Sequence, residues 1–325
     1  MFRFLYRFIM CLCLAAPCFA DTRIGVQTLT VDDLGDGRTL SLSVWYPAEK
    51  GGQPEAVGRN AVFLGQAAYR GAIPQSTRHP LVMLSHGGLR SAPDSGAWLA
   101  GRLAQAGFVA IEVNGPRPRL ALEAVDEIWR RPQDVSHAID RVLADKVWSD
   151  LVDGQRIAVV GHALGGTAAL ALAGGRIDAL SYVRSCDDER HDADCAWYAA
   201  QEVSLDRVDI AQMHSALRDP RIAAAIALNP EYSEAFLPGS LGALDAKSAQ
   251  IRLGDQSAAP IAGADLRFVA VKEGVQFDAF SLCTEQGLAI LAEDGGDTAL
   301  CRSGADQRSR VHDQIANQII LFLTQ

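Results

Sequence analysis

The chain has 325 residues, of which 49% are hydrophobic, and it carries a net charge of −9 at pH 7. A chain of this length and composition can bury a large core, and it contains no internal repeat or low-complexity tract. Its acidic balance disfavours nucleic acid and anionic membrane surfaces as partners, because both carry the same sign of charge.

Residues 1–20 have the pattern of a secretory signal peptide. Arg3 and Arg7 supply positive charge, a short apolar run follows, and Cys18-Phe19-Ala20 offers a small-residue cleavage site. The apolar run is too short to cross a bilayer, which needs roughly 20 residues. We therefore expect a periplasmic or secreted protein whose mature chain, residues 21–325, forms one domain without a membrane span. The signal holds two of the 30 basic residues and no acidic one, which leaves 28 against 39 and a net charge of −11.

Four cysteines remain in the mature chain, and an even number in an exported protein favours two disulfides. Three connectivities are open, and proximity along the chain favours Cys186–Cys195 and Cys283–Cys301. A zinc site is disfavoured, because neither pair has C-x-x-C spacing and no histidine pair accompanies them. We expect no metal and no cofactor.

Hydrophobic patterning predicts strands that alternate with helices along the mature chain. Two N-terminal strands are joined by a turn at 33–38. A Gly-, Pro- and Gln-rich surface excursion then covers 48–80, and an irregular, cysteine-bearing insertion covers about 176–219. In chain order, the predicted elements are strands 23–31, 39–46 and 80–84, helix 95–106, strand 107–113, helix 133–145, strand 156–161, helix 165–173, strands 221–228 and 266–271, and helix 312–323. This order predicts a three-layer α/β fold with a mostly parallel central sheet and an antiparallel N-terminal strand pair.

The turn between the strand at 156–161 and the helix that follows it carries the most informative motif. Gly161 and Gly165 lie two residues either side of Ala163, and Gly166 follows. This is the spacing of the G-x-S-x-G nucleophile elbow of α/β-hydrolases, where glycines leave room for a sharp turn. The motif therefore predicts an elbow that lacks only the serine hydroxyl. The alternative is an ordinary strand-to-helix turn whose glycines serve packing.

A second turn, about 75 residues earlier in the chain, supports the elbow interpretation. It follows the strand at 80–84 and fits the H-G-G loop that contributes to the oxyanion hole of α/β-hydrolases. Backbone N–H groups of this turn and of the residue after the nucleophile position would serve as donors. The residues expected on this side of a pocket are Ser85, His86, Gly87, Gly88, Leu89, His162 and Leu164.

With these motifs, the chain resembles the exported, platelet-activating-factor-acetylhydrolase-like branch of the dienelactone hydrolase group within the α/β-hydrolases. The order of the matching features is more specific than any one of them, and they span almost the whole mature chain. They are Trp45-Tyr46-Pro47, residues 80–88, residues 131–134 with Ile139-Asp140, the elbow at Gly161, residues 221–230, Phe277-Asp278, Cys283, and Cys301 with Arg310 and His312.

The resemblance implies three catalytic positions, and each has changed. The nucleophile position holds Ala163. A G-x-x-D-like stretch beginning at Gly254 puts Ser257 at the acid position, or Asp255 in a slipped alignment. The histidine position, at the start of an H-F-D-F-like run, is matched by Gln276. Alanine cannot attack an acyl carbon, and glutamine does not shuttle protons near neutral pH.

The histidines give a check that needs no alignment, because the catalytic histidine of α/β-hydrolases follows the other two residues along the chain. Only His312 lies beyond the last predicted strand, at the start of the closing helix, where we expect a helix-surface or capping role over that of a relocated base. His86 and His162 are expected to be structural.

Two functions follow from the sequence. The first is an exported, catalytically inactive hydrolase-fold protein, a pseudo-hydrolase, that binds a small ester-like or apolar ligand or another protein. The second is a carboxylic-ester hydrolase of dienelactone hydrolase or platelet-activating-factor-acetylhydrolase type, with a rearranged site that draws on Ser85, Ser257, Asp255 or His312.

Overall fold

The structure is a computed structural model that describes most of residues 23–325. Residues 1–20 lie outside the described residues, and so do Asp255 and Ser257. The described ranges are 23–32, 34, 37–89, 91–187, 194–213, 217–254, 260–261 and 263–325.

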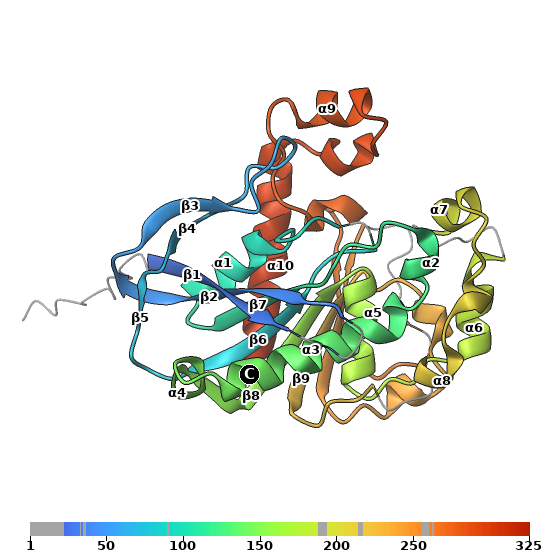
Figure 1. The fold of residues 1–325 in the computed structure, drawn as a ribbon, viewed down its shortest axis with the longest axis horizontal. Coiled ribbons are helices and arrows are strands. Elements are labelled where there is room, and N and C mark those ends of the chain that lie inside the picture. The colour runs from blue at the N-terminus through green and yellow to red at the C-terminus, as the bar shows by residue number, and fades with distance from the viewer. Residues whose placement is uncertain are drawn as a thin grey trace, which may run out of the picture.

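Within these ranges, eleven strands form one twisted sheet (Figure 1). The order across the sheet is β11-β10-β9-β8-β6-β7-β2-β1-β4-β3, and β5 pairs with β2. The strands are β1 (Arg23–Val31), β2 (Leu40–Lys50), β3 (Gln53–Val57), β4 (Gln66–Arg70), β5 (Ile73–Pro74), β6 (His79–Ser85), β7 (Val109–Asn114), β8 (Val152–His162), β9 (Ile222–Leu228), β10 (Lys247–Leu253) and β11 (Arg267–Val271).

The six strands from β6 to β11 pair in parallel, as the alternation of strands and helices predicted. The predicted N-terminal pair is also present, since β1 runs antiparallel to β2 with Val26 opposite Trp45. The strand β2 also runs antiparallel to β7. The β1–β2 pair therefore continues the sheet beyond β7, and the strand direction reverses where β2 meets β7.

Helices cover both faces of the sheet and give three layers. The helices are α1 (Ala97–Gln105), α2 (Ala121–Ala124), α3 (Glu127–Ala144), α4 (Trp148–Leu151), α5 (Leu164–Leu172), α6 (Ala179–Val183), α7 (Cys195–Ala200), α8 (Ile210–Met213), α9 (Gly287–Glu293) and α10 (Ala305–Thr324). Successive side chains of β6 point to opposite faces. Val82 and Leu84 share one buried core with α1 and α10, whereas Leu81 and Met83 share another with α3.

The predicted surface excursion at 48–80 is wrong in part, because β3, β4 and β5 lie within it. These strands form or adjoin the edge of the sheet, where polar side chains and proline are tolerated. Their sequences, such as Gln53–Val57, therefore lack the apolar run that marks a buried strand.

Further elements differ from prediction, and one is α3, which begins at Glu127 and not at residue 133. The strand β10 was missed because Gln250 interrupts its apolar pattern, although this side chain is buried and its Oε1 accepts a hydrogen bond from Ile261 N at 2.9 Å. The helix α10 begins at Ala305 and not at His312, because its first two turns are mostly polar and carry no hydrophobic periodicity.

Both predicted disulfides are confirmed. Cys186–Cys195 and Cys283–Cys301 have Cα–Cα distances of 5.4 and 5.8 Å, which is ordinary for a disulfide. The first lies in the predicted insertion, which folds into the short helices α6, α7 and α8 beside the carboxyl ends of the strands (Figure 1).

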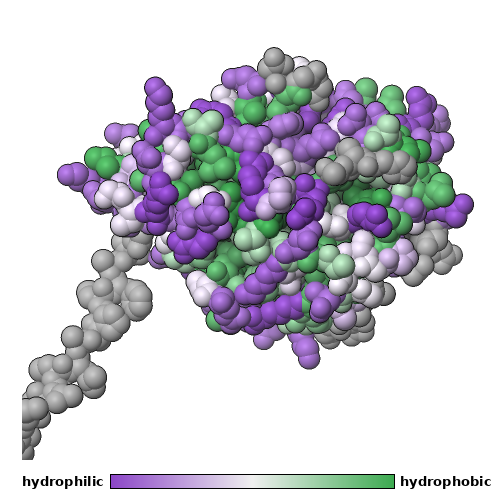
Figure 2. Space-filling view, turned by 90° about the horizontal axis from the view of Figure 1, so that it is seen from below, coloured by the Kyte–Doolittle hydropathy of each residue, from purple (hydrophilic) through white to green (hydrophobic). Residues whose placement is uncertain are grey.

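The surface is mixed in character. Figure 2 shows a face on which hydrophilic residues are interspersed with smaller hydrophobic areas. Large apolar side chains are exposed at scattered positions, for example Leu180 at 64% and Val147 at 54%, which is ordinary for a folded protein. Among the described helices, none is long and apolar enough to cross a membrane.

Candidate functional site

The strand-turn-helix elbow is present at Ala163. The residue joins β8 to α5 with φ 56° and ψ −124°, a backbone conformation that side-chain-bearing residues rarely adopt. Its N–H donates to Leu228 O at 3.0 Å, and its C=O accepts from Gly166 N at 2.8 Å. The positive φ is that of a sharp elbow, as the motif predicts, and the bonds to β9 and α5 hold the strained residue in place.

The flanking glycines are required by close backbone approach. A Cβ on Gly165 would lie 1.7 Å from Ser85 O, and a Cβ on Gly161 would lie 1.8 Å from Gly165 O.

We expect Gly165→Ala to destabilise the protein by more than about 3 kcal/mol, because overpacking against backbone forces the sheet and helix apart. Urea unfolding measures this. Gly154→Ala, whose Cβ would make an ordinary 3.5 Å contact with Leu143, is the control. Equal effects of the two changes would contradict the elbow geometry.

The turn after β6 lies against the elbow. Gly87 N donates to His162 O at 3.1 Å, and the Arg131 guanidinium donates to the carbonyl oxygens of Gly87 and Gly88 at 2.6 and 2.8 Å. Gly87 has φ +85°, and a side chain there would meet Ser91. Arg131, which belongs to the matching stretch 131–134, therefore fixes the turn through the carbonyl groups of Gly87 and Gly88.

His86 and His162 are packed beside each other, with ring centroids 4.8 Å apart. His86 Nε2 lies 2.9 Å from Ala279 O, and since a carbonyl only accepts, Nε2 carries the proton and Nδ1 faces Ser95 Oγ at 3.1 Å. Burial lowers the pKa of His86 to about 4. Burial and the neighbouring His86 hold the pKa of His162 well below its usual value. Both rings are therefore neutral at pH 7.

A cavity of about 350 Å³ opens beside the elbow. It brings together five of the predicted positions, Gly88, Leu89, His162, Ala163 and Gln276. The rest of its lining is Phe63, Ser91, Ala92, Ser95, Arg117, Asp194, Glu231, Phe277, Phe280, Leu291, Gly296, Asp297 and Leu300.

The remaining predicted positions do not line this cavity. Ser85 and His86 line an adjoining cavity of only about 50 Å³, which shares Leu89 and Ala92 with the larger one. Gly87 lines neither cavity, and the Leu164 side chain is buried in the core. The acid position that the resemblance implies, Ser257, and its alternative, Asp255, fall outside the described residues.

One wall of the larger cavity is aromatic. Phe280 stacks with Phe63 at a centroid distance of 6.4 Å and lies 6.1 Å from Phe277. The His162 ring meets Phe280 edge-on at 5.4 Å. Such a wall favours an apolar or aromatic group in the cavity.

Two buried carboxylates form a polar part of the cavity that sequence reasoning missed. A Cβ on Gly88 would lie 3.4 Å from Glu231 Oε1 and 3.5 Å from Asp194 Oδ2. Glu231 follows β9 at its carboxyl end, so its place after a strand was a usable signal. Asp194 comes from the insertion, next to the disulfide-bonded Cys195, and no local motif announces it.

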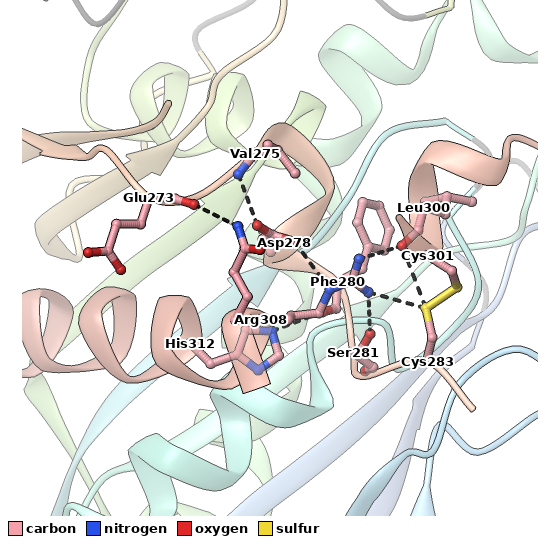
Figure 3. A network of polar contacts seen from close by, with 12 residues as sticks. Glu273, Val275, Asp278, Phe280, Ser281, Cys283, Leu300, Cys301, Arg308 and His312 are labelled. Atoms are coloured by element: carbon pink, nitrogen blue, oxygen red, sulfur yellow. Dashed lines mark hydrogen bonds and ion pairs between the residues drawn. A yellow bond between two sulfur atoms is a disulfide. The ribbon is translucent and has the colours of Figure 1, made fainter. Parts of the chain in front are cut away.

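The structure corrects the prediction for His312. The residue lies inside α10, only 4% exposed, with its ring stacked on Trp98 at 3.8 Å and its Nε2 donating to Phe280 O at 2.9 Å (Figure 3). A helix-surface role is wrong because the side chain is buried, and a capping role is wrong because α10 begins seven residues earlier. The side chain is not among the residues that line the cavity.

Burial lowers the pKa of His312 from 6.5 to about 4. As the pH falls, the unfolded chain takes up this proton at a higher pH than the folded protein does. The stability conferred by the neutral ring is therefore complete above pH 6.5 and is lost as the pH falls towards 4. We expect this residue alone to remove about 3 kcal/mol of unfolding free energy across that window. Urea unfolding at pH 7 and pH 4 of wild type and His312→Gln measures it. An equal pH dependence in the two proteins would contradict this assignment.

Gln276 is held by a buried ionic network. It begins a short 3-10 helix, Gln276–Ala279, whose Asp278 accepts from Val275 N at 2.9 Å and pairs with Arg308 at 3.4 Å. Arg308 also donates to Ser281 O at 2.9 Å (Figure 3). The network fixes the backbone that carries both Gln276 and the aromatic wall.

The described residues contain no cluster of three or more histidine, cysteine or acidic side chains arranged to hold a metal. What the site offers is an elbow without a nucleophile, two neutral histidines and an aromatic cavity.

No family model matches the chain, and no curated protein matches it in sequence. Among solved structures, a ferulic acid esterase from Streptomyces cinnamoneus is similar, with a TM-score of 0.59 and 20% identity over 95% of this chain and 91% of that chain. At this identity the likeness shows the fold and leaves function to be argued from the site. The parallel sheet, its antiparallel edge, the elbow and this neighbour together establish that the chain has the α/β-hydrolase fold.

Proposed function

We propose that this protein is a catalytically inactive α/β-hydrolase-fold protein that binds a small ester-like or apolar ligand beside its elbow. The observation that carries the proposal is Ala163, which occupies the apex of the elbow and lines the aromatic cavity. The cavity keeps room for a ligand, but the oxygen that would attack an acyl carbon is missing.

Gln276 supports the same proposal. It lines the cavity where the resemblance expects the catalytic histidine, and an amide cannot take up a proton near neutral pH. The assignment to the platelet-activating-factor-acetylhydrolase-like branch, and the loss of the acid at Ser257, rest on the sequence motifs.

We further propose that the protein acts in the periplasm or outside the cell as one domain, residues 21–325. Two disulfides are typical of proteins that fold in an oxidising compartment, and the signal-like pattern of residues 1–20 agrees. Another protein is the alternative binding partner, whereas the acidic charge disfavours nucleic acid.

A second candidate is an ester hydrolase with a rearranged site. The observation in its favour is Ser95, which lines the cavity with its Oγ 3.1 Å from His86 Nδ1, the proton-accepting nitrogen. The pKa of about 4 makes His86 a weak base at pH 7, however. We therefore favour binding over turnover.

Binding is tested by titrating the protein with Nile red, a neutral dye that fluoresces in apolar surroundings. We expect saturable binding that is competed by neutral aromatic esters and weakened at least tenfold by Ala92→Trp, which fills the cavity. Val147→Trp, at a residue 54% exposed that does not line the cavity, is the control. Equal affinity of the two variants would overturn the proposed site.

A further inference from the structure

We propose that residues 284–300 form a lid over the ligand cavity, closed at its base by the Cys283–Cys301 disulfide, and that ligand enters when this lid opens. The inference rests on the proposed function, since it assigns a gate to the same cavity. The segment contributes Leu291, Asp297 and Leu300 to the lining. In Figure 1 its helix α9 projects from one end of the molecule, away from the central sheet.

The contacts that hold the segment gather at its two ends. At the first end, Thr284 N and Oγ1 donate to Val62 O and Ala61 O, both at 2.8 Å. At the second end, Arg308 donates to Leu300 O at 2.5 Å. The disulfide joins both ends, and Arg308 also lies 3.4 Å from Cys283 Sγ (Figure 3).

Between these anchors the segment buries little of itself. Gly287 is its only buried residue, and Leu288 is 48% exposed. Segments with few buried apolar contacts open locally at low free energy. The disulfide closes this segment into a loop and restricts the conformations that the open segment can adopt. By chain entropy, a loop of this length favours the closed form by up to roughly 100-fold.

Gly287 offers a way to loosen the lid without removing a cysteine. A Cβ there would lie 2.7 Å from Val62 O and 3.3 Å from Cys301 Sγ. Since a backbone oxygen cannot move without shifting the chain around it, Gly287→Ala should displace α9 from its contact with Val62. Gly154→Ala, whose Cβ makes only an ordinary contact, is the matched control.

Access to the cavity is measured with an introduced thiol at its elbow. In the Ala163→Cys variant of the mature protein, with both native disulfides formed, the new thiol is the only free one, and its alkylation rate by N-ethylmaleimide reports lid opening. We expect Cys283→Ser with Cys301→Ser to raise this rate about 10- to 100-fold. Gly287→Ala should raise it several-fold, and Gly154→Ala should not change it. An unchanged rate in both lid variants would overturn the lid.

Hydrogen exchange distinguishes local opening of the lid from unfolding of the whole protein. The lid variants should lose protection in residues 284–300 and keep it in β6 and β8. If the cysteine variant also loses core protection, the alkylation rate of Gly287→Ala decides alone. Because alkylation needs no bound ligand, the lid and the proposed function fail separately: faster alkylation without Nile red binding by wild type overturns the function, and dye binding with unchanged alkylation overturns the lid.

Discussion

Restoring the catalytic positions should raise ester turnover on this scaffold by orders of magnitude. Ala163→Ser alone should give slight activity or none, because no imidazole stands at Gln276 to take the serine proton. Ala163→Ser with Gln276→His should do better, since both positions line one cavity. Adding Ser257→Asp should help further by orienting the imidazole. Loss of a full triad costs about 10⁶ in kcat, which sets the ceiling of the gain.

Hydrolysis of short p-nitrophenyl esters measures these steps against a heat-inactivated control. Ala163→Ser with Gln276→Asn is the matched variant, because it restores the hydroxyl and keeps a neutral amide. Replacing Asp255 in the restored protein, beside the Ser257→Asp change, tells which residue occupies the acid position. If the histidine and asparagine variants are equally active, Gln276 is not at the histidine position.

The second large effect concerns the buried pair of Asp278 and Arg308, which are 0% and 1% exposed. We expect Arg308→Met to cost about 3–5 kcal/mol of unfolding free energy, because the carboxylate stays buried without its counter-charge. Combining it with Asp278→Asn should recover part of the loss. Urea unfolding of the two single variants and the double variant measures the coupling.

An exposed ion pair between α1 and α10 provides the comparison. Arg102 Nη2 lies 2.5 Å from Asp313 Oδ1, and the two side chains are 46% and 53% exposed. Arg102→Met should therefore cost below about 1 kcal/mol of unfolding free energy. Similar losses for the two arginine variants would mean that the Asp278 network does not hold the cavity wall.

The fold was predicted from the sequence where buried parallel strands made apolar runs, as in β6 and β8. It was missed where edge position or a buried polar group broke the pattern, as in β3 and at Gln250. The elbow was predictable because its tight turn requires glycine at fixed positions, and this requirement is visible in the local sequence. The burial of His312 was not predictable, because it depends on contacts with residues distant in the sequence.

The cavity was only half predictable for the same reason. Ala163 and Gln276 were found through motifs, but Asp194 and Leu300 reach the cavity through disulfide-closed segments whose paths no local pattern shows. Ser95 was missed because its bond to His86 depends on how the turn after β6 folds back on α1.

Fluorophosphonate labelling of wild-type protein tests the central claim most directly, since these reagents phosphonylate serines that are activated as nucleophiles. A protein of residues 21–325 is incubated with excess reagent and its intact mass is measured, beside Ala163→Ser with Gln276→His as the positive control. We expect no adduct on wild type and one adduct on the restored variant. A stoichiometric adduct on wild type, located at Ser95 or another serine of the cavity and lost in the corresponding alanine variant, would show a working nucleophile and contradict the account.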